Sequence, residues 1–143
     1  QLPTVLRKDV QTVWIHKGNK PFGGGNKNLL IHIKQGEKYI SEEILEETLV
    51  HEACHTSLDL DHSKAKGWRK AQKADDEFIS TYAKDYPKRE DIAESFLTWL
   101  VVRHLSDRVS ELNVEKILKA IPNRIKYFDE QEFDMYPIVP LNR

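Results

Sequence analysis

The five residues HEACH, His51–His55, constrain the fold of this chain more than any other stretch. Two histidines four residues apart lie on the same face of an α-helix, one turn apart. Their imidazoles can then reach one metal ion at about 2.0–2.1 Å. Glu52 follows the first histidine, so its carboxylate lies beside the ion rather than on it, where a base must be to take a proton from a water at the metal. The sequence therefore predicts a zinc (Zn2+) site on a helix.

The helix that carries this motif is expected to span Ser41 to about Leu58. Ser41 is suited to the N-cap, and Glu42 and Glu43 would lie at the positive end of the helix dipole. The residues that recur at helical spacing are Ile44, Thr48, His51, His55 and Leu58. Because this face includes apolar residues, we expect it to be turned inward. Two inward imidazoles and a carboxylate need partners, and a metal ion would supply them.

Strands are expected before this helix and further helices after it. Val10–His16 and Leu29–Lys34 read as strands, and the segments 17–28 and 35–38 read as turns. The expected helices are Trp68–Tyr82, Lys88 to about Leu105, and Val114 to about Phe128 with an interruption or restart at Pro122. The segment 134–143 holds two prolines and is expected to be extended. This order predicts an α+β fold in a single domain, residues 1–143.

Two residues close to the motif, Asp61 and His62, could complete the zinc site. A ligand so soon after the second histidine requires a sharp turn, which glycine normally enables. Leu58 stands where that glycine would be, and the stretch TSLDLD holds no glycine. The alternative is that residues 59–62 cap and solvate the end of the helix.

Two carboxylates farther along the chain also compete for this role. Glu90 and Glu94 are four residues apart on an expected helix that must also bury Ala93 and Phe96. Burying two carboxylates is costly unless they are paired or bound to metal. One could bind zinc while the other accepts the free N–H of a ligating histidine. The alternative is an exposed carboxylate pair at a helix N-terminus, which the helix dipole favours.

The stretches LVHEACH, FISTYAKDYPKREDIAESF and VEKILKAIPNRIKYFDEQ together resemble the catalytic domain of anthrax lethal factor and its relatives, which include the clostridial Pro-Pro endopeptidases. The resemblance covers roughly residues 45 to 130. It implies a zincin-like fold of the gluzincin type, with a small twisted sheet, the motif on an active-site helix and a mostly helical C-terminal half. It also implies that Glu90 is the third zinc ligand and that Glu94 supports the site.

The same resemblance implies a catalytic tyrosine shortly before the third ligand. Tyr82, in STYA, is the match, although its eight-residue spacing to Glu90 is one more than expected for lethal factor. Tyr86 is the alternative. If the layout of the family holds, the strand Leu29–Lys34 would be the sheet edge beside the cleft. The glycine loop at 22–25 would either border the site or form a plain hairpin turn.

The function predicted from these residues is that of a zinc endopeptidase. Glu52 would be the general base and Tyr82 would stabilise the oxyanion, while His51, His55 and Glu90 hold the metal. The alternatives are a non-catalytic binding module in which zinc only staples the fold, and a zinc hydrolase that acts on other amides. The substrate would be a peptide or protein, and we expect a monomer.

Bulk composition narrows the partners and the compartment. A net charge of −1 with 31% charged residues predicts no overall attraction to nucleic acid or to a membrane surface. Cys54 is the single cysteine, so no internal disulfide is possible, and a small buried thiol is expected. The chain begins at Gln1 rather than Met, which is consistent with a removed signal peptide or other trimming. We therefore expect a secreted, extracellular protein.

Overall fold

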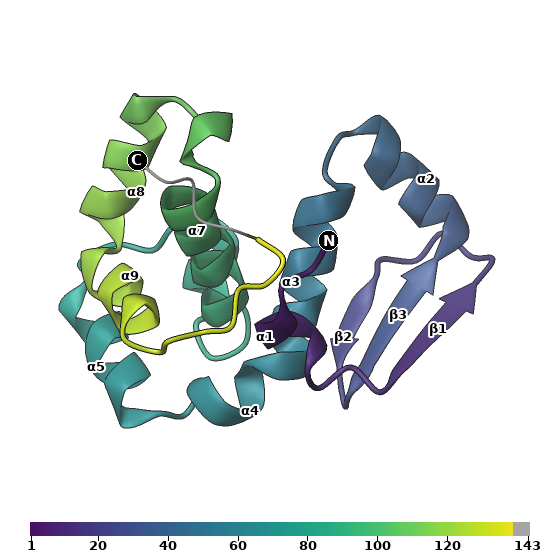
Figure 1. Ribbon diagram of the computed structural model, residues 1–143, viewed down its shortest axis with the longest axis horizontal. Coiled ribbons are helices and arrows are strands. Elements are labelled where there is room, and N and C mark those ends of the chain that lie inside the picture. The colour runs from purple at the N-terminus through teal and green to yellow at the C-terminus, as the bar shows by residue number, and fades with distance from the viewer. Residues whose placement is uncertain (139–143) are drawn as a thin grey trace.

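The computed structural model describes residues 1–138 and shows an α+β chain with a small mixed sheet at one end and a helical part at the other (Figure 1). The sheet contains β1 (Thr12–His16), β2 (Gly23–Gly25) and β3 (Asn28–His32) in the order β1-β3-β2. β1 runs parallel to β3, and β2 pairs with β3 in the antiparallel sense. The predicted fold class is therefore confirmed at the level of α+β.

The helices follow the sheet in the chain, apart from a short one at the N-terminus. Their bounds are α1 (Thr4–Arg7), α2 (Ile33–Ser41), α3 (Leu45–Ser57), α4 (Asp59–His62), α5 (Lys66–Ala74), α6 (Thr81–Asp85), α7 (Asp91–His104), the 3-10 helix η1 (Ser106–Arg108), α8 (Glu111–Ala120) and α9 (Pro122–Asp129). α3 stands between the sheet and the helical part, contacting β2 on one side and α7 on the other (Figure 1). Among residues 1–138, no helix is long and apolar enough to cross a membrane.

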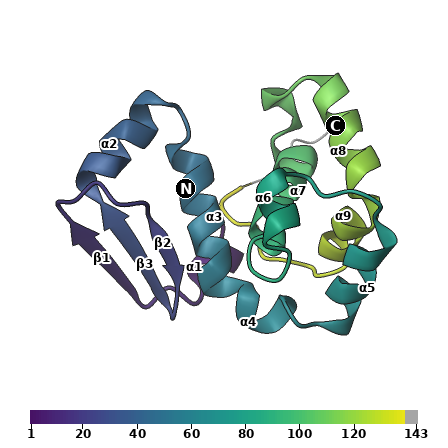
Figure 2. The ribbon, with the colours of Figure 1, turned by 180° about the vertical axis from the view of Figure 1, so that it is seen from behind.

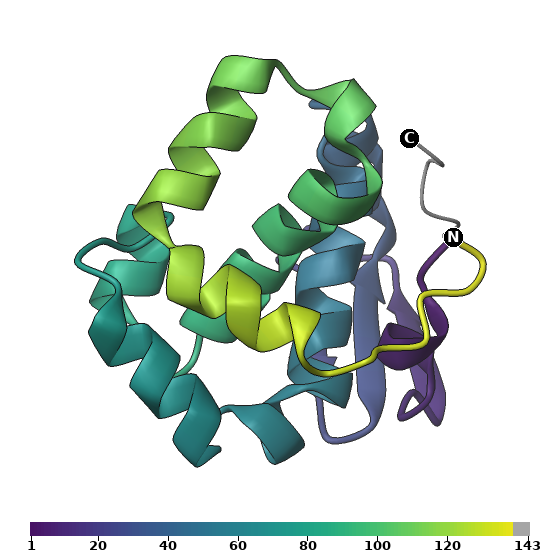
Figure 3. The same cartoon turned by 60° about the vertical axis from the view of Figure 1, so that its left-hand side comes forward.

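The main core lies on the helical side of α3. Figure 3 shows α7 running between α3 and the layer formed by α8 and α9. Buried aromatic rings from three helices meet there: Trp68 of α5, Phe96 of α7 and Phe128 of α9. Burying such rings is the largest apolar contribution that single side chains make to stability. Cys54 is buried in the same cluster, and burial raises the pKa of its thiol well above the usual value, so the thiol stays protonated.

The predicted start of the motif helix at Ser41 is wrong. Ser41 ends α2, its hydroxyl donates back to the carbonyl of Lys38, and the motif helix α3 begins at Leu45. Glu43 separates the two helices with a positive φ of 60°. α2 itself replaces a predicted turn: Gly36 lies within this helix, and a Cβ there would lie 3.3 Å from the Phe22 ring. Tertiary packing thus overrides the turn signal of this glycine.

The strand assignment also needs correction. LLIHIK ends as a strand at His32, and its strand, β3, is the centre of the sheet rather than the edge. The edge beside α3 is β2, which lies inside the segment predicted to be only a turn. The other edge, β1, is exposed along its whole length, including Trp14 at 59% exposure.

One predicted helix is divided and two are confirmed. The span 68–82 contains the end of α5 and the start of α6, separated by residues 75–80, because Asp75 adopts extended backbone angles and accepts hydrogen bonds from the first amides of α9. α7 confirms the helix expected over 88–105, but it begins at Asp91, three residues later than predicted. α8 begins at Glu111, three residues earlier than predicted, and the chain restarts as α9 at Pro122 as expected. Of the expected extended segment 134–143, residues 139–143 lie outside the described residues.

Candidate metal centre

α3 presents His51 and His55 on one face, as the four-residue spacing predicts. Their rings lie 4.9 Å apart between centroids, and the two Nε2 atoms are 3.1 Å apart. Both side chains are 15% exposed. The two ring nitrogens therefore point at one small volume beside the helix.

Glu90 brings a carboxylate to the same volume from the beginning of α7. Its Oε2 atom lies 3.2 Å from Nε2 of His51 and 3.1 Å from Nε2 of His55, and the residue is 2% exposed. Ligand atoms at about 2.0–2.1 Å from zinc at tetrahedral angles lie about 3.3 Å from one another. The three donor atoms fit that triangle closely, and two nitrogens with one carboxylate oxygen are a donor set that zinc accepts.

Each histidine is oriented by a carboxylate on its other ring nitrogen. Nδ1 of His51 lies 3.1 Å from Oε1 of Glu94, and Nδ1 of His55 lies 2.9 Å from Oδ2 of Asp59. These contacts fix the tautomer that leaves Nε2 free to bind a metal. The hydrogen bond from His51 lowers the pKa of Glu94, although burial opposes the shift. Burial alone would lower the pKa of His55, but the hydrogen bond and charge of Asp59 raise it.

Asp59 is the residue that the sequence analysis missed. Within the stretch 59–62, only Asp61 and His62 were considered as zinc ligands, and Asp59 was given no role beyond capping and solvating the helix end. Asp59 lies four residues after His55, at the beginning of α4, and its carboxylate reaches the imidazole of His55. That spacing is the signal that could have identified it.

Replacing either orienting carboxylate is expected to weaken zinc binding without abolishing it. Glu94→Ala and Asp59→Ala should each raise the zinc dissociation constant by about 10–100-fold, as loss of such a partner typically does. Competition with a chromogenic chelator measures the effect. Asp61→Ala is the control, because Asp61 lies on the surface, where it pairs with Lys8 at 3.8 Å. Equal affinity in Glu94→Ala and in the control would contradict the orienting role.

The backbone of Glu52 packs closely against β2 at Gly24. The amide of Gly24 donates a hydrogen bond to the Glu52 carboxylate. A Cβ on Gly24 would lie 1.8 Å from the carbonyl oxygen of Glu52, so no other residue fits there. The amide of Gly25 donates to Oγ1 of Thr56 at 2.8 Å, which ties the strand to α3. The glycine segment therefore both forms a hairpin with β3 and borders the centre.

The environment of Glu52 raises the pKa of its carboxyl above the usual value. Burial raises the pKa of the carboxyl, and the charge of Glu90 adds to the rise. His51, His55 and the Gly24 amide oppose the shift without cancelling it. A carboxylate with a raised pKa is suited to accept a proton and return it near neutral pH.

Tyr82 is the tyrosine that reaches the centre. Its ring stacks on His51 at 6.2 Å between centroids, and its hydroxyl hydrogen-bonds to Glu90. Burial and the negative charge of Glu90 raise the pKa of Tyr82, so the hydroxyl remains a donor. Tyr86 contacts the Tyr82 ring at 5.4 Å, and the two tyrosines are similarly exposed, at 51% and 47%, so contact with His51 and Glu90 is what distinguishes Tyr82. Figure 2 shows α6, which carries Tyr82, lying against α7.

The two nearer ligand candidates lie away from the centre. Nδ1 of His62 is 2.7 Å from the hydroxyl of Tyr127, and the His62 ring also packs against Phe133. Asp61 is on the surface beside Lys8. Because α4 follows α3 after Leu58 without a reversal, neither residue can turn back over His51 and His55.

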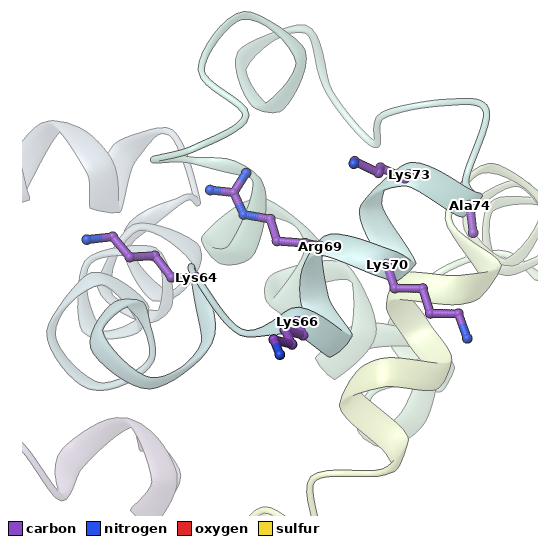
Figure 4. A pocket seen from close by; sticks show the side chains of 6 residues that line it. All are labelled: Lys64, Lys66, Arg69, Lys70, Lys73 and Ala74. Carbon is purple, nitrogen blue, oxygen red and sulfur yellow. The ribbon is translucent and has the colours of Figure 1, made fainter.

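Apart from the metal centre, the surface has a shallow pocket at α5 that is lined mainly by basic side chains (Figure 4). Its lining is Lys64, Lys66, Arg69, Lys70, Lys73 and Ala74. Figure 4 shows Arg69 and Lys73 on the same side of α5. The net charge of −1 therefore conceals an uneven distribution, with a local positive potential on this helix.

Comparisons with protein-family models, with curated proteins and with solved structures find no match to this chain. Its function is therefore argued from the geometry of its own residues.

Proposed function

We propose that this chain is a zinc-dependent endopeptidase domain with a zincin-like fold. The observation that carries the proposal is the convergence of Nε2 of His51, Nε2 of His55 and Oε2 of Glu90 within 3.2 Å of one another. The resemblance to the lethal factor group leads to the same three residues. Three protein ligands are typical of catalytic zinc sites, which keep a further position for water or substrate, whereas structural sites are closed by four.

Zinc, when bound, would supply Lewis acidity, which lowers the pKa of a water and polarises a carbonyl group. The residues of the chain carry out the proton transfers around it. Glu52 accepts a proton from the attacking water and returns it to the leaving amine. The Gly24 amide beside Glu52 lowers the pKa of its carboxyl and so favours the charged form, which accepts the proton. Tyr82 donates a hydrogen bond to the oxygen on which negative charge develops.

The edge strand β2 is the proposed binding edge for an extended substrate. A peptide can add to an exposed sheet edge through backbone hydrogen bonds. β2 is the half-buried edge beside α3, and its three glycines carry no side chains that would hold a substrate backbone away. The Gly25 amide already donates to Thr56, so a substrate would pair with the other backbone groups of this strand. This edge is therefore proposed in place of β3, which lies in the middle of the sheet.

A peptide library tests the proposed activity. Cleavage of internal peptide bonds should occur with the zinc-loaded protein, stop with a chelator and return when zinc is restored. Hydrolysis of other amides without peptide cleavage would favour the amide hydrolase. If the zinc-loaded protein hydrolyses nothing, but removal of zinc by a chelator lowers its unfolding temperature, the zinc-stapled module is favoured. We also propose that the protein is a monomer and that it acts outside the cell. Analytical sedimentation tests the oligomeric state, and fractionation of cultures into cells and medium tests the location.

Tyr82→Phe is expected to lower turnover by on the order of 10²–10³, as the loss of one oxyanion donor does. The Michaelis constant should change little, because the bond to the oxyanion strengthens only in the transition state. Steady-state kinetics on a cleaved peptide measures both quantities. Tyr86→Phe is the matched control and should keep near-normal turnover. The opposite pattern would move the role to Tyr86.

A further inference from the structure

Arg124, on α9, is a fully buried cation that no step of the proposed chemistry uses. Its side chain is 0% exposed, as are those of its two partners, Asp75 and Asp91. Nη1 donates to Oδ2 of Asp75 at 2.9 Å, and Nε donates to Oδ2 of Asp91 at 3.0 Å. Nη1 also donates to the carbonyl of Glu77 at 3.1 Å, and the guanidinium lies 4.7 Å from the centre of the Phe78 ring.

The partners of Arg124 belong to the two segments that carry the candidate centre. Asp91 is the residue after Glu90 and the first residue of α7. Asp75, Glu77 and Phe78 belong to the link between α5 and α6, which leads to Tyr82. Arg124 therefore joins the backbone beside the third ligand to the segment that delivers the tyrosine.

Further hydrogen bonds extend this connection. Gln72 donates to Oδ2 of Asp91 at 2.7 Å and to the carbonyl of Pro87 at 2.9 Å. The segment 87–91, which contains Glu90, is therefore bonded to the same amide group at both of its ends. Ser80 caps α6 and also hydrogen-bonds to Glu94, the carboxylate that orients His51. The two segments that Arg124 binds, the start of α7 and the link between α5 and α6, thus both lead to residues that contact the centre.

We propose that Arg124 is a positioning residue for the metal centre: it fixes Glu90 and Tyr82 in register with the histidines of α3. This inference rests on the proposed zinc site. A buried ion pair contributes little net stability compared with apolar packing, and its best-attested use is to specify one arrangement. A guanidinium suits the task because its planar fork can hold two carboxylates at fixed angles, whereas a lysine ammonium is a single point charge.

The chain provides a control for this proposal at a second arginine–aspartate pair, which is partly exposed (39% and 36%) rather than buried. Arg103 of α7 pairs with Asp129 of α9 through two hydrogen bonds of 2.9 and 2.7 Å. The Arg103 pair thus joins the same two helices as the Arg124–Asp91 pair. Asp91 and Arg103 are 12 residues apart on α7, which corresponds to about 18 Å along a helix. The control pair therefore lies far from Glu90.

The test compares Arg124→Lys with Arg103→Lys. Three quantities are measured for each variant and for the unmodified chain: the zinc dissociation constant, the visible absorption spectrum with cobalt in place of zinc, and the thermal unfolding of the metal-free protein. Arg124→Lys should weaken zinc binding by about 10–100-fold, the range typical for loss of a group that orients a ligand, and should alter the cobalt spectrum. Arg103→Lys should change the unfolding temperature alone, with zinc affinity within about twofold of the unmodified chain.

Asp91→Asn, which keeps the shape of the side chain, replaces Arg124→Lys if the latter does not fold, and the same loss of zinc affinity is expected. Unchanged zinc affinity and an unchanged cobalt spectrum in the folded variant would overturn the proposal, as would equal losses of affinity in both arginine variants. Failure of the unmodified chain to bind zinc would instead reject the metal centre itself, and the positioning role with it.

Discussion

Glu90→Ala should lose zinc and hydrolytic activity together. Glu90 supplies one of the three converging donor atoms, and its carboxylate is nearly inaccessible to solvent at 2% exposure. Without it, two histidines 3.1 Å apart remain, and two nitrogens alone do not form a tight zinc site. Metal analysis after dialysis against a weak chelator measures the loss, and peptide cleavage by the same preparation measures activity.

Asp61→Ala and His62→Ala are the controls for this loss and should keep most of the zinc and activity. Asp61 pairs with Lys8, and His62 contacts the Tyr127 hydroxyl, so neither reaches the centre. His62→Ala removes a partly buried hydrogen bond and should lower thermal stability, which distinguishes folding effects from metal effects. A zinc-free His62→Ala beside a zinc-loaded Glu90→Ala would reverse the ligand assignment.

Glu52→Gln should abolish measurable hydrolysis while leaving about one zinc per chain. Glutamine keeps the size of the side chain but cannot accept a proton, and general acid–base catalysis typically contributes about 10²–10⁴-fold to the rate. The metal should stay because the Glu52 carboxylate is not among the three converging ligand groups. Single-turnover cleavage assays and metal analysis on one sample measure the two effects separately.

The outcome for zinc in Glu52→Gln decides how its kinetics are interpreted. Retained zinc with lost hydrolysis assigns Glu52 the proton transfer. Loss of the metal would make Glu52 a ligand or an essential support, and the role proposed for it would be withdrawn. Glu47→Gln, on the first turn of the same helix, is a matched control and should retain both zinc and activity.

Helical spacing identified the two histidines from the sequence, because residues four apart share one face of a helix. The same spacing paired Glu90 with Glu94, but the choice of Glu90 as the third ligand came from the resemblance to the lethal factor group, since spacing alone left Asp61 and His62 as alternatives. The residues expected at the centre converge in the structure, although their chemical roles stay predictions. Asp59 follows the same rule and was missed because acidic residues at a helix end also serve as ordinary polar surface.

The parts of the fold that the sequence analysis missed depend on contacts distant in the chain. Gly36 indicates a turn locally, but the ring of Phe22 makes a helical glycine favourable there. Gly24 reads as flexible loop, yet its lack of a side chain allows β2 to pass against the backbone of Glu52. Asp75 interrupts an otherwise helical pattern because its carboxylate binds Arg124 from α9, almost 50 residues later in the chain. Local propensity contains no information on such partners.

Anomalous diffraction from crystals grown with zinc, recorded on both sides of the zinc absorption edge, is the most direct test of the proposed centre. The expected result is a single strong peak about 2.0–2.2 Å from Nε2 of His51, Nε2 of His55 and a carboxylate oxygen of Glu90. A peak bound by Asp61 or His62, or no peak between α3 and the start of α7, would contradict the zinc site on which the proposed function rests.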